Sequence, residues 1–347
     1  MNTINFNSIV KEAWQNYDES RSIVSISDVS AMVSTNHVYR VKFADNNFVI
    51  AKLSYFGKYG HFVEDHSIIN SLSNNLPAPF DNFLARSLVK KRELFIYHYK
   101  RELLDVWVIF YRPIKIKSKL PKRLDESHIV NLAQQFALFH KACTKVRHTL
   151  PASSKSTKSD IESLLNYLNT DEGHYEYGIV QEDLERQCNS YLRFYNISQS
   201  VAIPIIPVFV DWNIGNFSVT KSGKLFSRWD YDWFRMSTRM MDFYFLSRVV
   251  SNVGDCTVFT YNIETLNEDR FILFLKNYHK IYPLTKFEIQ MLPEMYRFFL
   301  LNYVIKYGRF FFHEVYATKL QTEAFKIQLP SIENFNVSKL LNSLNLG

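Results

Sequence analysis

Cysteine, glycine and long apolar runs are all scarce in this sequence. Its 347 residues include only three cysteines, which are widely separated and odd in number, so neither a disulfide framework nor a cysteine-based metal site is predicted. The longest apolar stretch, VAIPIIPVFV at 201–210, is too short to cross a bilayer. The first residues, MNTINFNSIVKEAW, lack the basic start and apolar core of a secretion signal. These absences predict a soluble, cytoplasmic protein with reduced thiols.

Aromatic and apolar residues, by contrast, are plentiful. Hydrophobic side chains make up 47% of the chain, aromatic side chains 16% and charged side chains 22%. This composition is typical of a globular protein with enough apolar material for a sizeable core, in which large rings can anchor long helices. We expect one large domain or two lobes.

The net charge is +7, and the densest basic run, KIKSKLPKR at 115–123, raises the question of nucleic-acid binding. Aromatic residues do not interleave there in a stacking pattern, so a solvated loop is the favoured interpretation. A positive protein attracts anionic small molecules such as nucleotides equally well. We therefore expect neither a nucleic acid nor a membrane as partner; steeply salt-dependent DNA or RNA binding would indicate otherwise.

The first hundred-odd residues have the pattern of a small sheet with one helix. Two β-rich runs within 38–53 flank a turn at 45–47, whose Asp-Asn-Asn sequence is typical of a hairpin. Apolar residues recur at helical spacing over 61–72. Further strands are predicted at 93–99 and 105–111.

The rest of the chain is predominantly helical. Helical periodicity covers 128–143, and residues from about 240 to 316 have the composition of packed helices. Between them, 201–232 returns to strand patterns. This order predicts an N-terminal lobe, 1–112, and a larger C-terminal lobe, 113–347, with a cleft between them.

The clearest chemical signal is VFVDWNIGNF at 208–217, where a buried strand ends in a carboxylate and an amide five residues apart. Phosphoryl transfer from a nucleotide needs a cation at the phosphates, a carboxylate near the acceptor hydroxyl and oxygen ligands for a metal ion. Asp211 and Asn216 supply the carboxylate and an oxygen ligand at the spacing of a kinase catalytic loop. Asp230 follows 14 residues after Asn216, on the far arm of a hairpin that could return it to the same metal.

With these residues in view, the chain resembles the aminoglycoside phosphotransferase and choline kinase family, the small-molecule branch of the protein-kinase-like fold. DWNIGN at 211–216 matches the family's HGDxxxxN loop from its aspartate onward, and WDYDWFRMSTRMMDF at 229–243 matches its (I/V)DFDxAxxGxxxxDL segment. STNHVYRVKFADNNFVIAK at 34–52 resembles the family's first strands, and FALFHKAC at 136–143 resembles its LHxA helix. The matches occur in order along the chain.

The resemblance implies an α+β, protein-kinase-like two-lobe fold, with a small β-rich N-terminal lobe and a larger, mostly helical C-terminal lobe that carries the catalytic hairpin. It also implies ATP- and Mg²⁺-dependent transfer of the γ-phosphate to a hydroxyl of a small molecule, such as an amino alcohol, an aminoglycoside or a sugar. The identity of the acceptor and the oligomeric state are left open.

Five residues of the C-terminal lobe take roles from the resemblance. Asp211 is implied to be the base or hydroxyl-orienting group, and Asn216 and Asp230 the metal ligands. Asp232 is a possible further acid near the metal or the acceptor. Asp242 is expected to be structural, fixing the loop by backbone hydrogen bonds. Taken singly, each of these residues is also typical of a turn or a helix start.

The nucleotide-binding candidates belong to the N-terminal lobe. Lys52 stands at the place of the lysine that contacts the nucleotide phosphates, and Glu64 is the best candidate for the helix glutamate that pairs with it, with Asp65 as a rival. The segment before the first strand pair contains no glycine, although a phosphate-covering loop usually brings backbone close to the nucleotide. Ser34 and Asn36 are expected to donate hydrogen bonds there instead.

A second departure lies in the loop itself, because Phe209 and Val210 stand where the family has His and Gly. In the kinase fold that histidine mainly packs and braces the metal-binding segment, so a phenylalanine could keep the packing while losing a hydrogen bond. Two hypotheses therefore stay open. The chain is an active small-molecule kinase, or it is a catalytically weak or inactive pseudokinase-like protein that binds a nucleotide or another ligand.

The remaining candidates concern aromatic rings. His140 lies on the apolar stripe of its helix, which predicts a packed, hydrogen-bonded histidine rather than an acid or base. Trp212, Trp229, Tyr231 and Trp233 could form a cage for a quaternary ammonium acceptor. Core packing explains most of these rings equally well.

Overall fold

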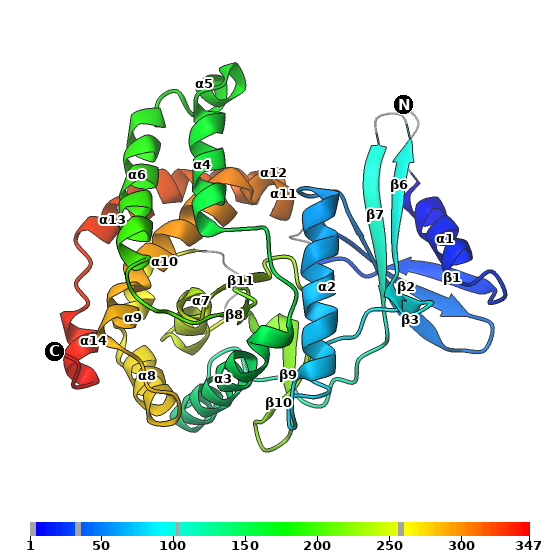
Figure 1. Ribbon diagram of the computed structural model, residues 1–347, viewed down its shortest axis with the longest axis horizontal. Coiled ribbons are helices and arrows are strands. Elements are labelled where there is room, and N and C mark those ends of the chain that lie inside the picture. Colours follow the sequence, from blue (N-terminus) through cyan, green and yellow to red (C-terminus); the bar gives the residue numbers. More distant parts are fainter. Residues whose placement is uncertain (1–4, 32–35, 102–103, 256–259) are drawn as a thin grey trace.

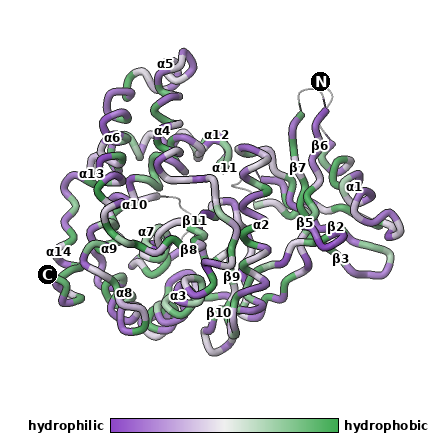
Figure 2. The backbone as a smooth tube through the Cα atoms, viewed as in Figure 1, coloured by the Kyte–Doolittle hydropathy of each residue, from purple (hydrophilic) through white to green (hydrophobic). Residues whose placement is uncertain are grey.

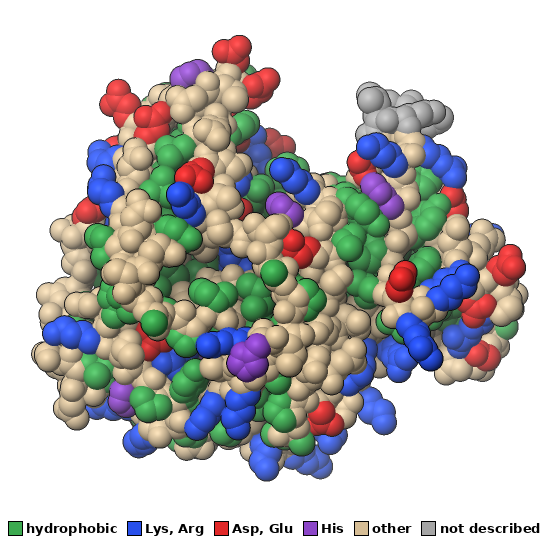
Figure 3. Space-filling view, viewed as in Figure 1, with side chains coloured by type: hydrophobic (Ala, Val, Ile, Leu, Met, Phe, Trp, Pro, Cys, Tyr) green, Lys and Arg blue, Asp and Glu red, His purple; other side chains and the backbone are tan. Residues whose placement is uncertain are grey.

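The computed structural model describes residues 5–31, 36–101, 104–255 and 260–347. A sheet-rich N-terminal lobe and a larger helical lobe lie side by side (Figure 1). On the face shown in Figure 3 the surface is hollowed between them. The predicted two-lobe α+β architecture is therefore confirmed.

The N-terminal sheet has five antiparallel strands in the order β1-β2-β3-β7-β6. Their bounds are Ile23–Asp28 (β1), His37–Phe43 (β2), Phe48–Ser54 (β3), Ile96–Arg101 (β6) and Leu104–Tyr111 (β7). A short ladder of β4 (Val89–Lys90) and β5 (Glu93–Leu94) precedes β6. β2 and β3 form the predicted hairpin, and its turn places Asn46 at φ 63°, a left-handed conformation that asparagine tolerates.

Two helices flank this sheet. α1 (Phe6–Tyr17) lies on its outer side and buries Trp14 in a cluster with β-strand residues. α2 (Tyr59–Asn75) lies between the sheet and the C-terminal lobe (Figure 1). Ile68 and Leu72 of α2 belong to the same apolar core as the helical lobe. Burial on α2 therefore ties the two lobes together.

The C-terminal lobe is built around α7 (Met240–Val250), every residue of which is buried. The surrounding helices are α3 (Glu126–Val146), α4 (Thr157–Leu168), α5 (Asp171–Tyr177), α6 (Gln181–Ser198), α8 (Asp269–Ile281), α9 (Lys286–Gln290), α10 (Leu292–Phe299), α11 (Gly308–Phe311), α12 (Glu314–Glu323), α13 (Leu329–Glu333) and α14 (Ser338–Ser343). Two π-helical segments, Leu300–Lys306 and Ala324–Gln328, continue α10 and α12. No sequence pattern predicted these π segments, which are often found at functional sites.

Two short ladders within this lobe carry the motif residues. Their strands are β8 (Ile205–Val208), β9 (Phe217–Val219), β10 (Leu225–Arg228) and β11 (Arg235–Thr238). The last residue of β8 pairs with the first of β11, and the first residue of β9 pairs with the last of β10. The β8–β9 loop (209–216) and the β10–β11 loop (229–234) are therefore closed at both ends by strand pairing and run beside each other.

The described helices all fall short of the length and apolarity needed to cross a membrane. Figure 2 shows hydrophilic residues interspersed along helices such as α6 and α8. This alternation is what amphipathic helices packed around a buried core require.

Candidate active site

Asp211 and Asp230 lie in these two loops, where the backbone takes left-handed conformations. Val210 has a φ of 60° and Asp230 a φ of 67°. Such conformations are unfavourable for residues other than glycine, above all for a β-branched valine, and each costs about 1–3 kcal/mol. They persist only where the surroundings hold the backbone in place, and they cluster at functional sites.

A buried hydrogen-bond network holds the first turn of the β8–β9 loop. Asp242 Oδ1 accepts hydrogen bonds from the backbone N–H groups of Phe209 (3.0 Å) and Val210 (2.7 Å). Its Oδ2 lies 3.0 Å from His140 Nε2, and His140 Nδ1 lies 2.9 Å from the Tyr278 hydroxyl. Asp242 and His140 are fully buried. The contacts expected of a structural Asp242 and of a packed His140 are thus both present.

Asp211 follows this anchored turn. Its Oδ1 accepts a hydrogen bond of 3.1 Å from Asn213 N–H. Burial, together with the nearby negative charge of Asp230, raises the pKa of Asp211 to about 6. A carboxylate with a pKa close to neutrality is suited to accept a proton from a hydroxyl group.

Asn216 and Asp230 are joined to the same loop through the backbone. Asn216 Nδ2 lies 3.5 Å from the Asp211 carbonyl oxygen, and Trp229 N–H donates to the Asn216 carbonyl oxygen at 3.0 Å. The Asp230 side chain is 39% exposed, which leaves it accessible to an external ligand. In the described part of the chain, no three His, Cys, Asp or Glu side chains form a metal site by themselves. An amide and a carboxylate oxygen fit Mg²⁺, which keeps phosphate and water among its ligands.

Lys52 is buried at the interface of the lobes and lies beside two of the predicted acids. Its Nζ is 3.2 Å from Asp230 Oδ1 and also donates to Asp232 Oδ1. Asn36 Nδ2 donates to the other oxygen of Asp232. Although burial opposes charge on Lys52, Asp230 and Asp232 raise the pKa of the lysine. We call Lys52, Asn36, Asp230 and Asp232 the Lys52 cluster.

The pKa values of Asp230 and Asp232, the two acids of the Lys52 cluster, are shifted in opposite directions. Burial raises the pKa of Asp232 to about 6, with Asp230 adding to the rise. Burial also acts against charge on Asp230, but Lys52 and the Asp232 N–H outweigh it and lower the pKa of Asp230. Asp230 is therefore the acid that stays ionised most readily, as a metal ligand requires.

The expected pairing of Lys52 with Glu64 is not what the structure contains. Glu64 Oε1 accepts hydrogen bonds from Ser153 Oγ and Ser154 N–H, both at 2.8 Å. Its rival Asp65 pairs with Lys155 Nζ at 2.5 Å. The reason is the rotation of α2, which turns the buried His66 inward, so that Glu64, two residues earlier, faces away. Ser34 lies outside the described residues.

The aromatic residues near the loops are mostly part of the core. Trp212, Tyr231 and Trp233 are 0%, 4% and 6% exposed, so they do not form an open cage for an ammonium group. Phe209, which stands in the histidine position, is 1% exposed and packs within 6 Å of several rings. These three rings of the predicted cage therefore belong to the core, and Trp229 is partly buried against the same core.

Two residues that sequence reasoning did not assign to the site also contact the loops. Asp255 Oδ2 accepts a hydrogen bond of 2.6 Å from Ile214 N–H. Arg228 Nη2 donates to the carbonyl oxygens of Asp211 (2.9 Å) and Asp230 (3.4 Å). A charged residue at the end of the otherwise apolar and small-residue strand LFSR was a usable signal for Arg228. Asp255 carried no such signal, since it lies in a loop.

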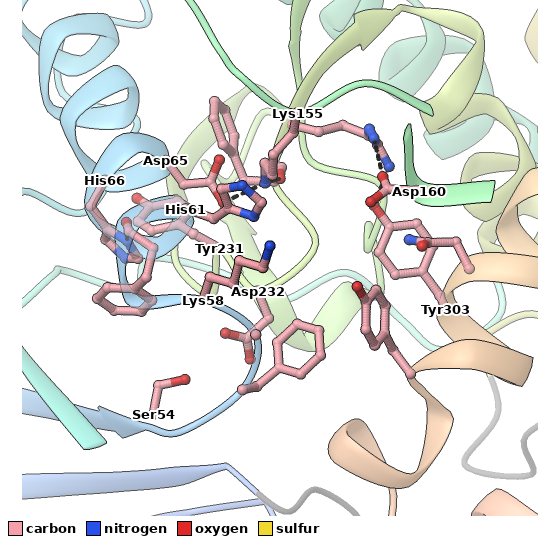
Figure 4. A pocket seen from close by; sticks show the side chains of 17 residues that line it. Ser54, Lys58, His61, Asp65, His66, Lys155, Asp160, Tyr231, Asp232 and Tyr303 are labelled. Carbon is pink, nitrogen blue, oxygen red and sulfur yellow. Dashed lines mark hydrogen bonds and ion pairs between the residues drawn. The ribbon is translucent and has the colours of Figure 1, made fainter. Parts of the chain in front are cut away.

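A cavity opens next to Asp232, between the start of α2, the segment before α4 and the π-helical segment 300–306. Figure 4 shows His61, Asp65, Lys155, Asp160 and Tyr303 around it. Arg235 pairs with Asp160 at 2.8 Å and Lys155 with Asp65. Polar atoms of its lining are left without partners within the described chain, namely Asp65 Oδ1, Arg235 Nε and Asn302 Oδ1. The cavity is thus lined by charged and polar side chains from both lobes.

Comparison with known proteins identifies the fold. No model of a protein family matches the sequence, and no curated protein matches it either. Solved structures do match, and they are kinases that act on small molecules. The chain has the two-lobe, protein-kinase-like fold of the small-molecule phosphotransferases, as the motif resemblance predicted.

Three similar structures illustrate the match. An amicoumacin kinase, solved with AMP-PNP, Ca²⁺ and Ami, has a TM-score of 0.63 at 13% identity, with 97% of each chain covered. Choline kinase LicA from Streptococcus pneumoniae has a TM-score of 0.56 at 13% identity, covering 95% of this chain and 99% of its own. A microcompartment-associated aminopropanol kinase has a TM-score of 0.54 at 14% identity, covering 98% and 99%. At these identities the likeness defines the fold.

Proposed function

We propose that this protein is a cytoplasmic, ATP- and Mg²⁺-dependent phosphotransferase that moves the γ-phosphate of ATP to a hydroxyl of a small molecule. The observation that carries the proposal is the meeting of three groups from separate segments. Lys52 of β3 lies 3.2 Å from Asp230 of the β10–β11 loop, and that loop is joined to Asp211 through Arg228. A cation, a metal-binding carboxylate and a proton acceptor are the parts that phosphoryl transfer needs.

Each residue has a distinct task in this proposal. Lys52, in the nucleotide-binding lobe (1–112), leaves its acid partners and contacts the nucleotide phosphates. Asn216 and Asp230 hold Mg²⁺, which when bound would neutralise phosphate charge. Asp211, in the C-terminal lobe (113–347), orients the acceptor hydroxyl and accepts its proton, since its raised pKa favours proton uptake near neutral pH.

The polar cavity beside Asp232 is the proposed entrance for the acceptor. It adjoins the Lys52 cluster because Asp232 lines it. Its charged and polar lining residues, which include Asp65, Lys155 and Asp160, favour an acceptor with several hydrogen-bonding groups. Amino alcohols, aminoglycosides and sugars all meet this description.

The direct test is consumption of ATP in the presence of Mg²⁺ and a panel of amino alcohols, sugars, aminoglycosides and nucleosides. We expect turnover with at least one acceptor, and its loss in Asp211→Ala. Asp183→Ala, which removes an exposed carboxylate on α6, serves as the matched control and should keep the activity. Absence of turnover across the panel would contradict the enzyme proposal.

A second candidate is a nucleotide-binding protein with little or no turnover. It is favoured by one observation: Lys52 and Asn36 are engaged with Asp232, and Lys52 also with Asp230. Thermal denaturation with and without Mg-ATP separates the cases. Stabilisation without turnover supports the binding protein, whereas no stabilisation at millimolar nucleotide contradicts both candidates.

A further inference from the structure

Arg228, the last residue of β10, is fully buried between the two loops. Its guanidinium carbon lies 4.0 Å from the centre of the Trp212 ring and 4.6 Å from that of Phe209. A desolvated cation over an aromatic face is stabilised by the charge distribution of the ring. The aromatic residues of the β8–β9 loop thus form part of the binding pocket for this one side chain.

The same side chain joins the two loops through their main chains. Arg228 Nη2 donates to the carbonyl oxygen of Asp211 at 2.9 Å and reaches that of Asp230 at 3.4 Å. The main chain of Arg228 is itself anchored: its N–H donates to the Phe83 carbonyl oxygen at 2.7 Å, and its carbonyl oxygen accepts from Ala85 N–H at 2.9 Å. Arg228 is therefore a fixed point from which both loops are held.

This arrangement is unfavourable for the stability of the fold alone. Arg228 Nε and Nη1 have no hydrogen-bond partner in the described chain, although burying an incompletely paired charge is destabilising. The negative charges of Asp211 and Asp242 offset part of the cost. An apolar side chain of similar length would fill the space without these unpaired donors, so packing does not explain an arginine at this position.

We propose that Arg228 is a positioning residue that sets the separation of Asp211 from Asp230, and with it the geometry of the proposed metal site. The effect of Arg228 on catalysis rests on the proposed function. The hydrogen bonds from one guanidinium to both loops do not depend on that function. Neither loop can shift without breaking a hydrogen bond to the same group.

The first experiment compares Arg228→Met with Arg297→Met. Arg297 is also a buried arginine, paired with Glu294 on α10, and controls for the general effect of losing a buried guanidinium. In Arg228→Met we expect the Mg²⁺ concentration for half-maximal ATP consumption to rise about tenfold and kcat to fall about 10- to 100-fold, because small displacements of reacting groups are this costly. The KM for the acceptor should stay within about twofold. Metal dependence and kcat equal to those of Arg297→Met would overturn the proposal.

A conservative variant separates positioning from charge. Arg228→Lys keeps the cation but replaces the planar fork with a single ammonium group. We expect it to recover only part of the lost kcat, since one ammonium cannot hold both carbonyl oxygens in the same geometry. Full recovery would show that charge alone is needed and would overturn the positioning role.

The second experiment needs no activity. Hydrogen exchange of the backbone amides is measured in the nucleotide-free protein for residues 209–216 and 229–234. In Arg228→Met we expect exchange to accelerate in both loops by about tenfold relative to Arg297→Met, because the loops lose their shared anchor. Unchanged exchange in both loops overturns the proposal even if no acceptor is found. Faster exchange in a protein that consumes no ATP would support Arg228 while contradicting the proposed function.

Discussion

The two sides of the candidate site differ in what their polar groups are bonded to. On the side of the β8–β9 loop, the buried Asp242 carboxylate contacts His140 and the backbone N–H groups of Phe209 and Val210. Each of these hydrogen bonds is 3.0 Å long or shorter. We call this set the Asp242 network. In the Lys52 cluster, the lysine and Asn36 are bonded to Asp230 and Asp232, which are themselves candidate ligands for the metal or the substrate.

This difference separates a preorganised part of the site from a part that must rearrange. The Asp242 network needs no external partner, so it can hold Asp211 in place before any ligand binds. Nucleotide binding, in contrast, requires Lys52 to exchange carboxylate oxygens for phosphate oxygens. Breaking the contacts within the Lys52 cluster therefore lowers the affinity for the nucleotide.

Removing the charge of Asp211, which lies between the two parts, should have the largest effect. We expect Asp211→Asn to lower ATP consumption by about 10²–10⁴-fold, the usual contribution of a general base. The same change should stabilise the fold at pH 7. Because the pKa of Asp211 is raised to about 6, the folded protein binds more protons than the unfolded chain between about pH 4 and pH 6, and stability falls as the pH rises through that window.

The size of this stabilisation follows from the shift. A pKa raised by about two units corresponds to on the order of 2–3 kcal/mol in the free energy of unfolding at pH 7. Denaturant unfolding at pH 7 and at pH 4 measures it, and the advantage of Asp211→Asn should shrink at the lower pH. A variant less stable than the wild type at pH 7 would contradict the assigned environment of Asp211.

The Asp242 network should be the part most sensitive to loss of stability. We expect Asp242→Ala to lower the free energy of unfolding by about 3–5 kcal/mol, since it leaves buried groups of Phe209, Val210 and His140 without their partner. Asp232→Ala is the matched control from the Lys52 cluster. It should cost less than Asp242→Ala, because the Asp232 side chain is 17% exposed and Lys52 keeps Asp230 as a partner at 3.2 Å. Equal costs for the two variants would remove the distinction between the two parts.

Lys52→Met tests the other part through ligand affinity. We expect binding of Mg-ATP to weaken by about tenfold or more, since a buried cation aimed at the phosphates is lost. Glu64→Gln is the control: its carboxylate contacts Ser153 and Ser154 instead of Lys52, so affinity should change by less than about twofold. Calorimetric titration gives both values. A large effect of Glu64→Gln would show that α2 rotates when nucleotide binds.

The residues of the loops could be predicted from sequence because their chemistry is local. Asp211 and Asp230 come shortly after the ends of β8 and β10, Asn216 stands five residues after Asp211, and Asp242 lies in the first turn of α7. The partner of Lys52 could not be predicted in the same way. It depends on the rotation of α2, which is decided by the packing of residues such as Ile68 against the C-terminal lobe.

The same limit applies to the fold. The hairpin of β2 and β3 and the helix α2 follow from periodicity and turn chemistry. The contact of Arg228 with both loops depends on how β8 pairs with β11 and β9 with β10, a long-range arrangement that no short sequence pattern encodes. The π-helical segments also depend on tertiary packing, since their sequence is that of an ordinary helix.

Phe209→His should have the smallest effect, and it sharpens the comparison most directly. If the loop lacked a brace, restoring the family's histidine would raise turnover. The structure contains a brace already, because Arg228 lies over Phe209 and holds the carbonyl oxygens of Asp211 and Asp230. We therefore expect turnover to stay within about twofold or fall slightly, while stability drops by about 1–2 kcal/mol as a polar ring enters a packed aromatic site. A large rise in turnover would show that Arg228 leaves the loop insufficiently held.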